Sequence, residues 1–284
     1  MVNNGHTNTR NDFIFSYCLL LEEGCKHIAK GRQNMIITIA AQKGGVGKTT
    51  TAAAMAQALG LKKKNKVLLI DCDGQASASN LYGIRAENGA GLYEVIKGSA
   101  AASEAIRETE AGAIIPGGGG LYGLDVELQN KPGRDLFLKK ALEEISGQYT
   151  HIIIDTAPGL GTCLIQALTA SQGVIIPVLC DAQSLNGVRK ITNTIKEVQE
   201  FCNNDLQLLG VLITRYQPRT ILARQYEDLI KEEAAANGTK LLNTKIRQGV
   251  AIQEAQALRK NLYNYAPKSK PAEDYLKLIK ELKI

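Results

Sequence analysis

The sequence predicts an α/β fold in which a doubly wound, mostly parallel sheet carries helices on both faces. Short runs rich in Ile, Val and Leu recur along the chain without polar alternation, as in strands that are buried on both sides. Helix-like stretches separate these runs, and such connections between parallel strands are right-handed crossovers. A glycine-rich segment follows the first run directly, at the sheet edge where open α/β folds bind their ligands.

The individual elements follow in chain order from these runs. The predicted strands are the apolar, β-branched segments at residues 35–40, 66–71, 113–115, 151–155, 173–178 and 208–214. Predicted helices lie between them, for example at residues 48–61, 135–145 and 185–201. The glycine run at residues 117–120 breaks the pattern and is predicted to be a mobile surface loop.

The chain divides into two compositional zones. Residues 1–34 are first Asn-rich, then apolar, then basic. They are interpreted as an N-terminal arm, disordered or with a short helix, or as a segment that precedes a true start at Met35. No linker interrupts residues 35–284, which are therefore predicted to form one domain.

Composition excludes several classes of protein. The 284 residues are 44% hydrophobic and 22% charged, which suits a chain with a sizeable core and excludes wholesale disorder. No apolar run approaches the roughly 18 residues that cross a bilayer, and no secretory signal is recognisable, so a cytoplasmic location is expected. The six cysteines form no CxxC pair, which argues against a metal cluster.

Positive charge is concentrated in the last third of the chain. The net charge is +6, and residues 201–284 hold 14 Lys and Arg against 9 Asp and Glu. Such a surface suits a polyanion such as DNA or anionic lipid. An excess of positive charge by itself, however, is more often found on helix surfaces that simply face solvent.

The strongest motif is the segment from Gln42 to Thr50, Gln-Lys-Gly-Gly-Val-Gly-Lys-Thr-Thr, between the first predicted strand and a predicted helix. Its glycines allow backbone amides to converge on phosphate oxygens, and the helix N-terminus adds positive potential. Lys48 is predicted to reach the β- and γ-phosphates of a nucleotide, and the Thr49 hydroxyl to bind Mg²⁺. Thr50 is predicted to contact a phosphate nearer the ribose. The predicted phosphate-binding residues are Lys43, Gly44, Gly45, Val46, Gly47, Lys48, Thr49 and Thr50.

This segment resembles the deviant Walker A motif of the ParA/MinD family of ATPases. Gln42 stands where the usual motif has its first glycine, and Lys43 is an additional lysine. In that family the additional lysine reaches the partner's phosphates in a nucleotide-sandwich dimer, where a cation stabilises the transition state. The resemblance therefore implies a homodimer that forms on ATP binding.

Three aspartates complete the resemblance. The segment Asp71-Cys-Asp73-Gly-Gln75 is similar to the family's D-x-D-x-Q motif, in which the second aspartate positions the attacking water and the first lies near Mg²⁺. Gly74 stands where the family commonly has proline, which leaves this loop less restrained. Asp155 ends an apolar strand as a Walker B aspartate does, and is implied to hold Mg²⁺ through water.

Later segments resemble the partition branch of the family, of the ParA/Soj type. The segment at residues 178–187 looks like a switch, and those around Thr214, Ile246 and Arg247 are implied to border the adenine. The implied function is an ATP-dependent dimerising switch that binds DNA non-specifically and hydrolyses ATP slowly to segregate or position DNA, with a ParB-like partner and nucleoid association. The candidate DNA-binding residues are Arg219, Arg224, Arg247, Arg259 and Lys260. Some relatives carry a DNA-contacting arginine where this chain has Ala251, which leaves the footprint open.

Two alternatives stay open. A MinD-like membrane-cycling ATPase would use a terminal amphipathic helix, and residues 275–282 do carry an apolar face at helical spacing. That face is interpreted as packing against the domain, so no stable membrane insertion is expected. A metabolic relative, either an ATP-dependent ligase or an iron–sulfur ATPase, is the third possibility, although Cys163 stands alone in its segment.

Overall fold

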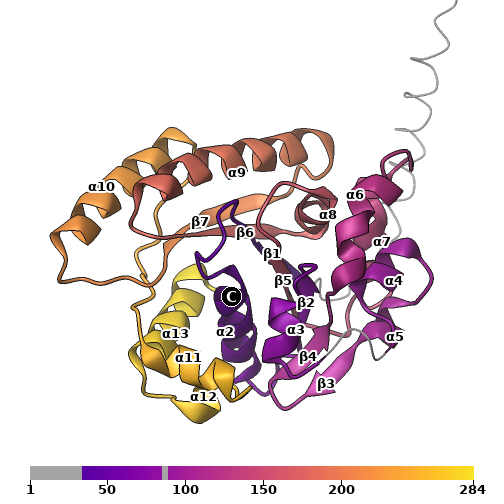
Figure 1. Cartoon of the computed structure of the whole chain (residues 1–284), viewed down its shortest axis with the longest axis horizontal. Coiled ribbons are helices and arrows are strands. Elements are labelled where there is room, and N and C mark those ends of the chain that lie inside the picture. The colour runs from indigo at the N-terminus through magenta and orange to yellow at the C-terminus, as the bar shows by residue number, and fades with distance from the viewer. Residues whose placement is uncertain (1–33, 85–88) are drawn as a thin grey trace, which may run out of the picture. The chain divides into compact units, whose positions relative to one another are not determined.

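The computed structural model describes residues 34–84 and 89–284, so the predicted N-terminal arm lies outside the described residues except for Asn34. The described residues contain a seven-stranded sheet in the order β3-β4-β2-β5-β1-β6-β7 (Figure 1). The strands are β1 (Met35–Ile39), β2 (Val67–Cys72), β3 (Arg107–Thr109), β4 (Gly112–Ile115), β5 (His151–Thr156), β6 (Gly173–Val178) and β7 (Gln207–Ile213). All neighbouring strands are parallel except β3 and β4, which form an antiparallel pair at one edge. The predicted mostly parallel α/β sheet is confirmed.

Helices of very different length connect the strands. The long ones are α2 (Lys48–Gly60), α8 (Thr162–Ala170), α9 (Ala182–Phe201), α10 (Ile221–Ala236), α11 (Val250–Ala257) and α13 (Lys270–Leu282). The short ones are α3 (Ser77–Leu81), α4 (Leu92–Lys97), α5 (Ala102–Ala105), α6 (Leu124–Glu127), α7 (Phe137–Glu143) and α12 (Leu262–Tyr265), with 3₁₀ turns η1 (Gly119–Gly123) and η2 (Arg134–Leu136). None of these described helices has the length and hydropathy to cross a membrane.

The core lies in two layers, one on each face of the sheet. Alternate residues of a strand point to opposite faces, so Ile37 of β1 packs with α2 and α13 while Ile36 packs with the helices opposite. Figure 1 shows α2 and α11–α13 on one side of the sheet, and α9 and α10 on the other. Because both faces are covered, the strands are apolar throughout, which is the pattern that the sequence displays.

The C-terminal helix α13 packs on the domain as predicted. Tyr275, Leu278 and Ile279 are buried against α2, and the Tyr275 hydroxyl lies 3.1 Å from that of Thr51. Leu276, which the sequence analysis assigns to this apolar face, is instead exposed. The face that a membrane-inserting helix would need is therefore part of the core.

Two predictions about the β2–β5 region need correction. Strand β3 is absent from the predicted strands, because its three residues are all charged or polar and form only a short edge pairing. The glycine run at 117–120 is not simply a surface loop: Gly117 is buried, and Gly119 begins the turn η1. The backbone at Gly117 passes directly beside the end of β2, where no side chain fits.

Candidate functional site

The loop between β1 and α2 has the backbone conformation of a phosphate-binding cradle. Gly45 and Gly47 have φ values of 74° and 85°, in the left-handed region that favours glycine. Gly47 directly precedes α2, so the free amides of the helix N-terminus lie at the loop, where they favour an anion. The position of a Cβ on Gly44 has no atom within 4 Å, which leaves the loop open to a ligand.

The lysine at the start of α2 is buried among acidic groups. Lys48 is only 6% exposed, and its Nζ donates a 3.0 Å hydrogen bond to the carbonyl oxygen of Lys43. Burial lowers the pKa of Lys48, while the charges of Asp155 and Asp73 oppose that change. Lys48, Asp73 and Asp155 therefore converge here, with the Lys48 ammonium group between the loop and the two carboxylates.

Two aspartates stand side by side at the carboxyl ends of neighbouring strands. The parallel register of β2 and β5 pairs Asp71 with Asp155, and Asp155 also pairs with Ile39 at the end of β1. Both carboxyl groups are fully buried. Burial raises the pKa of Asp71 to about 6, against the hydrogen bonds that it accepts from Ser79 and the Asp73 amide.

Asp155 is the aspartate with free coordinating capacity. Neither of its carboxylate oxygens has a hydrogen-bond partner among the residues that the structure describes, although Thr49 is close enough to lower its pKa. Burial, followed by the charge of Asp71, raises the pKa of Asp155 well above its ordinary value. A buried carboxylate without hydrogen bonds, next to a threonine hydroxyl, is a donor set that fits Mg²⁺.

The carboxylate of Asp71, in contrast, accepts hydrogen bonds from within the protein. Its Oδ2 accepts hydrogen bonds from the Ser79 amide at 2.7 Å and from the Ser79 hydroxyl at 2.6 Å, and its Oδ1 accepts one from the Asp73 amide at 3.2 Å. These bonds use most of the carboxylate's lone pairs. A direct metal bond from Asp71 stays a prediction, and its visible role is to hold the start of α3 and the backbone of Asp73.

Asp73 lies on the loop that follows β2. Its Oδ1 accepts a 2.9 Å hydrogen bond from the Gln75 amide, and its carbonyl accepts one from the Ala76 amide, so the loop forms a tight turn. Asp73 is buried, yet its side chain reaches the cleft described next. This placement suits a carboxylate that faces a bound ligand.

A cleft of about 680 Å³ joins the loop to the C-terminal part of the chain. Glycines of the loop line it together with Lys48, Thr49 and Thr50, and Gln256 of α11 donates a 3.0 Å hydrogen bond to the Thr50 hydroxyl. The three residues predicted to border adenine also line this cleft, namely Thr214, Ile246 and Arg247. The structure therefore brings six of the eight predicted phosphate-binding residues and the three predicted adenine residues to one cleft of the size that ligands occupy, whereas Lys43 and Val46 do not line it.

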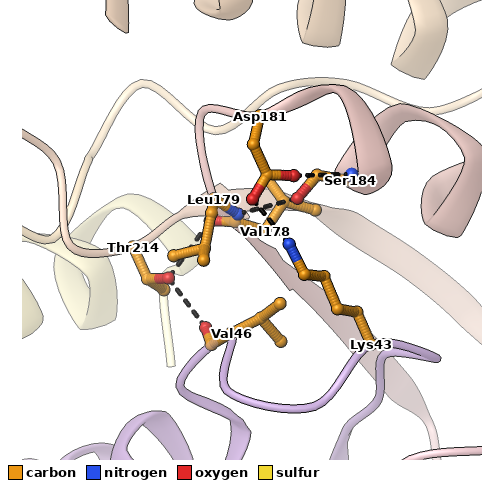
Figure 2. Close-up of polar contacts among 7 residues, drawn as sticks. All are labelled: Lys43, Val46, Val178, Leu179, Asp181, Ser184 and Thr214. Atoms are coloured by element: carbon orange, nitrogen blue, oxygen red, sulfur yellow. Dashed lines mark hydrogen bonds and ion pairs between the residues drawn. The ribbon is translucent and has the colours of Figure 1, made fainter.

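The structure gives two of those residues additional tasks. The hydroxyl of Thr214 lies 2.7 Å from the carbonyl oxygen of Val46 and 3.1 Å from that of Val178, so the end of β7 holds the loop in place (Figure 2). Arg247 donates from Nε and Nη2 to the two carboxylate oxygens of Asp274, each at 2.7 Å. Its guanidinium group is thus paired within the domain.

The additional lysine of the loop is paired as well. Lys43 Nζ lies 2.6 Å from Asp181 Oδ2, and Figure 2 shows the two side chains reaching toward each other from the loop and from the segment before α9. Asp181 also caps α9, because its Oδ1 accepts a 2.9 Å hydrogen bond from the Ser184 amide. Both members of the ion pair remain partly exposed.

The remaining candidate DNA-binding residues lie in two places. Arg219 and Arg224 are exposed around the start of α10, and Arg259 and Lys260 are exposed after α11. None of these four forms an ion pair with another residue that the structure describes. Their side chains are therefore exposed and unpaired within the described residues, whereas the Arg247 side chain is paired with Asp274 and only partly exposed.

Sequence reasoning assigned no role to several residues that shape the site. Ser79 and Gln256 have no motif signal, because their contacts join segments 8 and 206 residues apart. Asp181 carried a readable signal, since an aspartate directly before a helix is a common N-cap, but its pairing with Lys43 spans 138 residues. Contacts of that range depend on the fold.

Sequence comparison supports the reading of the motifs. Residues 34–208 match the model of a family described as an AAA domain. The chain is 39% identical over 250 residues to the sporulation initiation inhibitor protein Soj of Bacillus subtilis strain 168, which covers 87% of this chain and 97% of that protein. It is 34% identical over 250 residues to the chromosome partitioning protein ParA of Myxococcus xanthus, covering 87% of each.

Solved structures share the fold over nearly the same residues. Cobyrinic acid a,c-diamide synthase from Mycobacterium smegmatis, with a bound ATP analogue and magnesium, superposes with a TM-score of 0.75 at 31% identity, covering 88% of this chain and 96% of that one. The septum site-determining protein MinD of Pyrococcus horikoshii, complexed with Mg-ADP, has a TM-score of 0.70 at 26% identity, with the same coverage. With the two-lysine loop, the paired aspartates and these relatives together, the chain belongs to the family of ParA/Soj-type P-loop ATPases.

Proposed function

We propose that this protein is a Mg²⁺-dependent ATPase of the partition type: ATP binding forms a dimer that binds DNA without sequence preference, and slow hydrolysis releases it. The observation that carries the proposal is that Lys48 lies within the influence of both Asp73 and Asp155, beside a cleft that the loop glycines, Thr49 and Asp73 line. The name of one relative, the chromosome partitioning protein ParA, supports a role in partition. A ParB-like partner protein that stimulates hydrolysis and association with the nucleoid belong to the same proposal.

Each residue has a task in the proposed reaction. The loop amides and Lys48 bind the phosphates, and Thr49 with Asp155 would hold Mg²⁺, which neutralises charge on the phosphate oxygens when bound. Asp73 orients the attacking water. Lys43 leaves Asp181 and reaches the phosphates bound by the partner subunit, where its charge stabilises the transition state.

The proposed DNA contacts are electrostatic. Arg219, Arg224, Arg259 and Lys260 offer exposed cations, and a dimer presents each of them twice. Contacts of this kind to phosphates carry no sequence information and weaken steeply with salt. We therefore place DNA affinity in the dimer and not in the monomer.

DNA binding and vesicle binding test the proposal together. Wild type, Lys48→Ala and Asp73→Ala are incubated with arbitrary duplex DNA, or with vesicles of anionic lipid, in ATP or ADP across a salt series. Lys63→Ala is the matched control, since that lysine is exposed and follows the opposite end of α2 from the loop. The proposal predicts DNA binding with ATP only, retained in Asp73→Ala and Lys63→Ala and lost in Lys48→Ala. ATP-dependent attachment to vesicles without DNA binding would contradict it and favour a membrane-cycling ATPase.

A further inference from the structure

The side chain of Tyr122, in the turn η1, lies flat on the loop that carries Asp73. A Cβ built on Gly74 would lie 2.7 Å from Cζ of Tyr122 and 2.8 Å from both Cε1 and Cε2. These near-equal distances mean that the face of the ring, at its phenol end, covers the backbone of Gly74. Only glycine leaves room for the ring in this position.

A second contact joins the same tyrosine to the next residue of the loop. The side-chain amide of Gln75 donates a hydrogen bond to the Tyr122 hydroxyl. The ring is also near the carboxylate: partial desolvation, and then the charge of Asp73, raise the pKa of the Tyr122 phenol. Tyr122 thus contacts both residues that follow Asp73, from outside the turn.

The chain that delivers Tyr122 is anchored beneath the same loop. A Cβ on Gly117 would lie 2.6 Å from the carbonyl oxygens of Asp71 and Asp73, and the Gly117 amide donates a 3.0 Å hydrogen bond to the Ser79 hydroxyl. Gly120 approaches the ring of Tyr93 equally closely, with 2.8 Å from a built Cβ to Cγ. Gly117 and Gly120 therefore allow close approach of the backbone to its neighbours. The segment after β4 can in this way pass under Asp71–Asp73 and place the Tyr122 ring on Gly74.

We propose that Tyr122 is a positioning residue for Asp73. Its ring clamps Gly74 and Gln75 and so restrains the turn that carries the aspartate, in a loop that glycine would otherwise leave loose. This inference rests on the proposed function, in which Asp73 orients the attacking water. Tyr122 itself does not line the nucleotide cleft and touches no part of the phosphate loop among its described contacts.

Tyr122 is 58% exposed, and its ring is the outer end of the side chain. The ring can therefore turn away when another side chain occupies its position against Gly74. Gly74→Ala is therefore expected to displace the ring and leave the domain folded, which mimics Tyr122→Ala from the opposite side of the contact. Tyr122→Phe keeps the ring on Gly74 and loses only the hydrogen bond from Gln75. Val126→Ala is the matched control, because Val126 is a 78% exposed apolar residue of the adjoining helix α6.

The test is steady-state hydrolysis of radiolabelled ATP, with melting temperatures to show that each variant is folded. Tyr122→Ala and Gly74→Ala should each lower kcat roughly tenfold, because small misplacements of reacting groups cost up to about a hundredfold, while KM for ATP stays within about twofold. The double variant should be no worse than either single one, since both remove the same contact. Tyr122→Phe should retain kcat within about threefold, and Val126→Ala should match wild type.

The outcomes separate this inference from the proposed function. If wild type hydrolyses ATP and Lys48→Ala does not, but Tyr122→Ala keeps the wild-type kcat or changes KM alone, the positioning role is wrong and the proposed function stands. Additive losses in the double variant would also overturn it. If wild type does not hydrolyse ATP, both proposals fall.

Discussion

Lys43 Nζ lies 2.6 Å from Asp181 Oδ2, so the lysine that the proposed dimer needs is held within its own subunit. The pair is partly exposed, and ion pairs of this kind contribute only about 0.2–1 kcal/mol. The pKa of Asp181 lies below its ordinary value: burial acts in the opposite direction, but the hydrogen bonds from Lys43 and the Ser184 amide outweigh it. A contact this weak can be exchanged for the stronger attraction of phosphates.

Releasing that ion pair should favour dimerisation. Asp181→Asn removes the charge but keeps a side-chain oxygen that can cap α9. We expect the protein concentration at half-dimerisation, measured by sedimentation with a non-hydrolysable ATP analogue, to fall a few-fold, consistent with the loss of about 0.2–1 kcal/mol per subunit. Glu197→Gln, which removes an exposed carboxylate from the same helix, is a control for charge alone. Weaker dimerisation of Asp181→Asn would mean that Asp181 supports the dimer and does not restrain Lys43.

The buried aspartates make the nucleotide-free protein sensitive to pH. The pKa of Asp71 is raised to about 6 in the folded state, so between about pH 4 and pH 6 the unfolded chain binds fewer protons than the folded one. The free energy of unfolding should therefore fall as pH rises through that window, by on the order of 3 kcal/mol from this group. Urea unfolding in EDTA at several pH values measures this, and rising stability across the window would contradict it.

Asp155 extends the same argument and couples it to the ligand. Its raised pKa predicts that Asp155→Asn, which removes the charge of this buried side chain, stabilises the protein at pH 7.5 in EDTA. The same variant should lose most of the thermal stabilisation that Mg²⁺ and ATP give to wild type. A variant that is less stable than wild type without ligand, yet equally stabilised by Mg²⁺ and ATP, would contradict the assignment of Asp155 to the metal.

Arg247 should behave as a structural residue. Asp274, its partner, is 4% exposed, and removing one member of such a pair leaves a buried charge unpaired. We expect Arg247→Ala to lower the free energy of unfolding by about 2–4 kcal/mol, whereas Arg219→Ala and Arg224→Ala change it by less than about 0.5 kcal/mol. In DNA titrations the latter two variants should weaken binding and flatten its salt dependence. An Arg247→Ala variant with wild-type stability but weaker DNA binding would reverse these roles.

The sequence predicted those features that depend on residues close together in the chain. Apolar runs and the glycines before Lys48 predicted the parallel sheet and the loop, because buried strands and left-handed turns restrict their residues strongly. The position of Asp71 and Asp155 at one sheet edge also followed, since parallel strands end there, but their direct pairing in neighbouring strands did not. The short strand β3 did not follow, because an edge strand of three residues leaves no periodic pattern.

Other parts of the site depend on contacts that no local pattern encodes. Residues 117–120 have the composition of a surface loop, and only the fold shows that Gly117 packs closely against the carbonyl oxygens of Asp71 and Asp73. In the same way, the charge of Arg247 suggests a DNA contact, and only the fold shows that its guanidinium group pairs with Asp274. Such assignments need the fold, because the two partners are distant in sequence.

The most direct test of the switch is the molecular mass of the protein in ATP and in ADP, measured by light scattering for wild type, Asp73→Ala and Lys43→Ala. Asp73→Ala should be a stable dimer in ATP and a monomer in ADP, because it keeps the loop and lacks the residue proposed to orient water. Lys43→Ala should bind ATP yet stay a monomer. A mass that does not depend on the nucleotide, or a dimer of Lys43→Ala as stable as that of Asp73→Ala, would contradict the account.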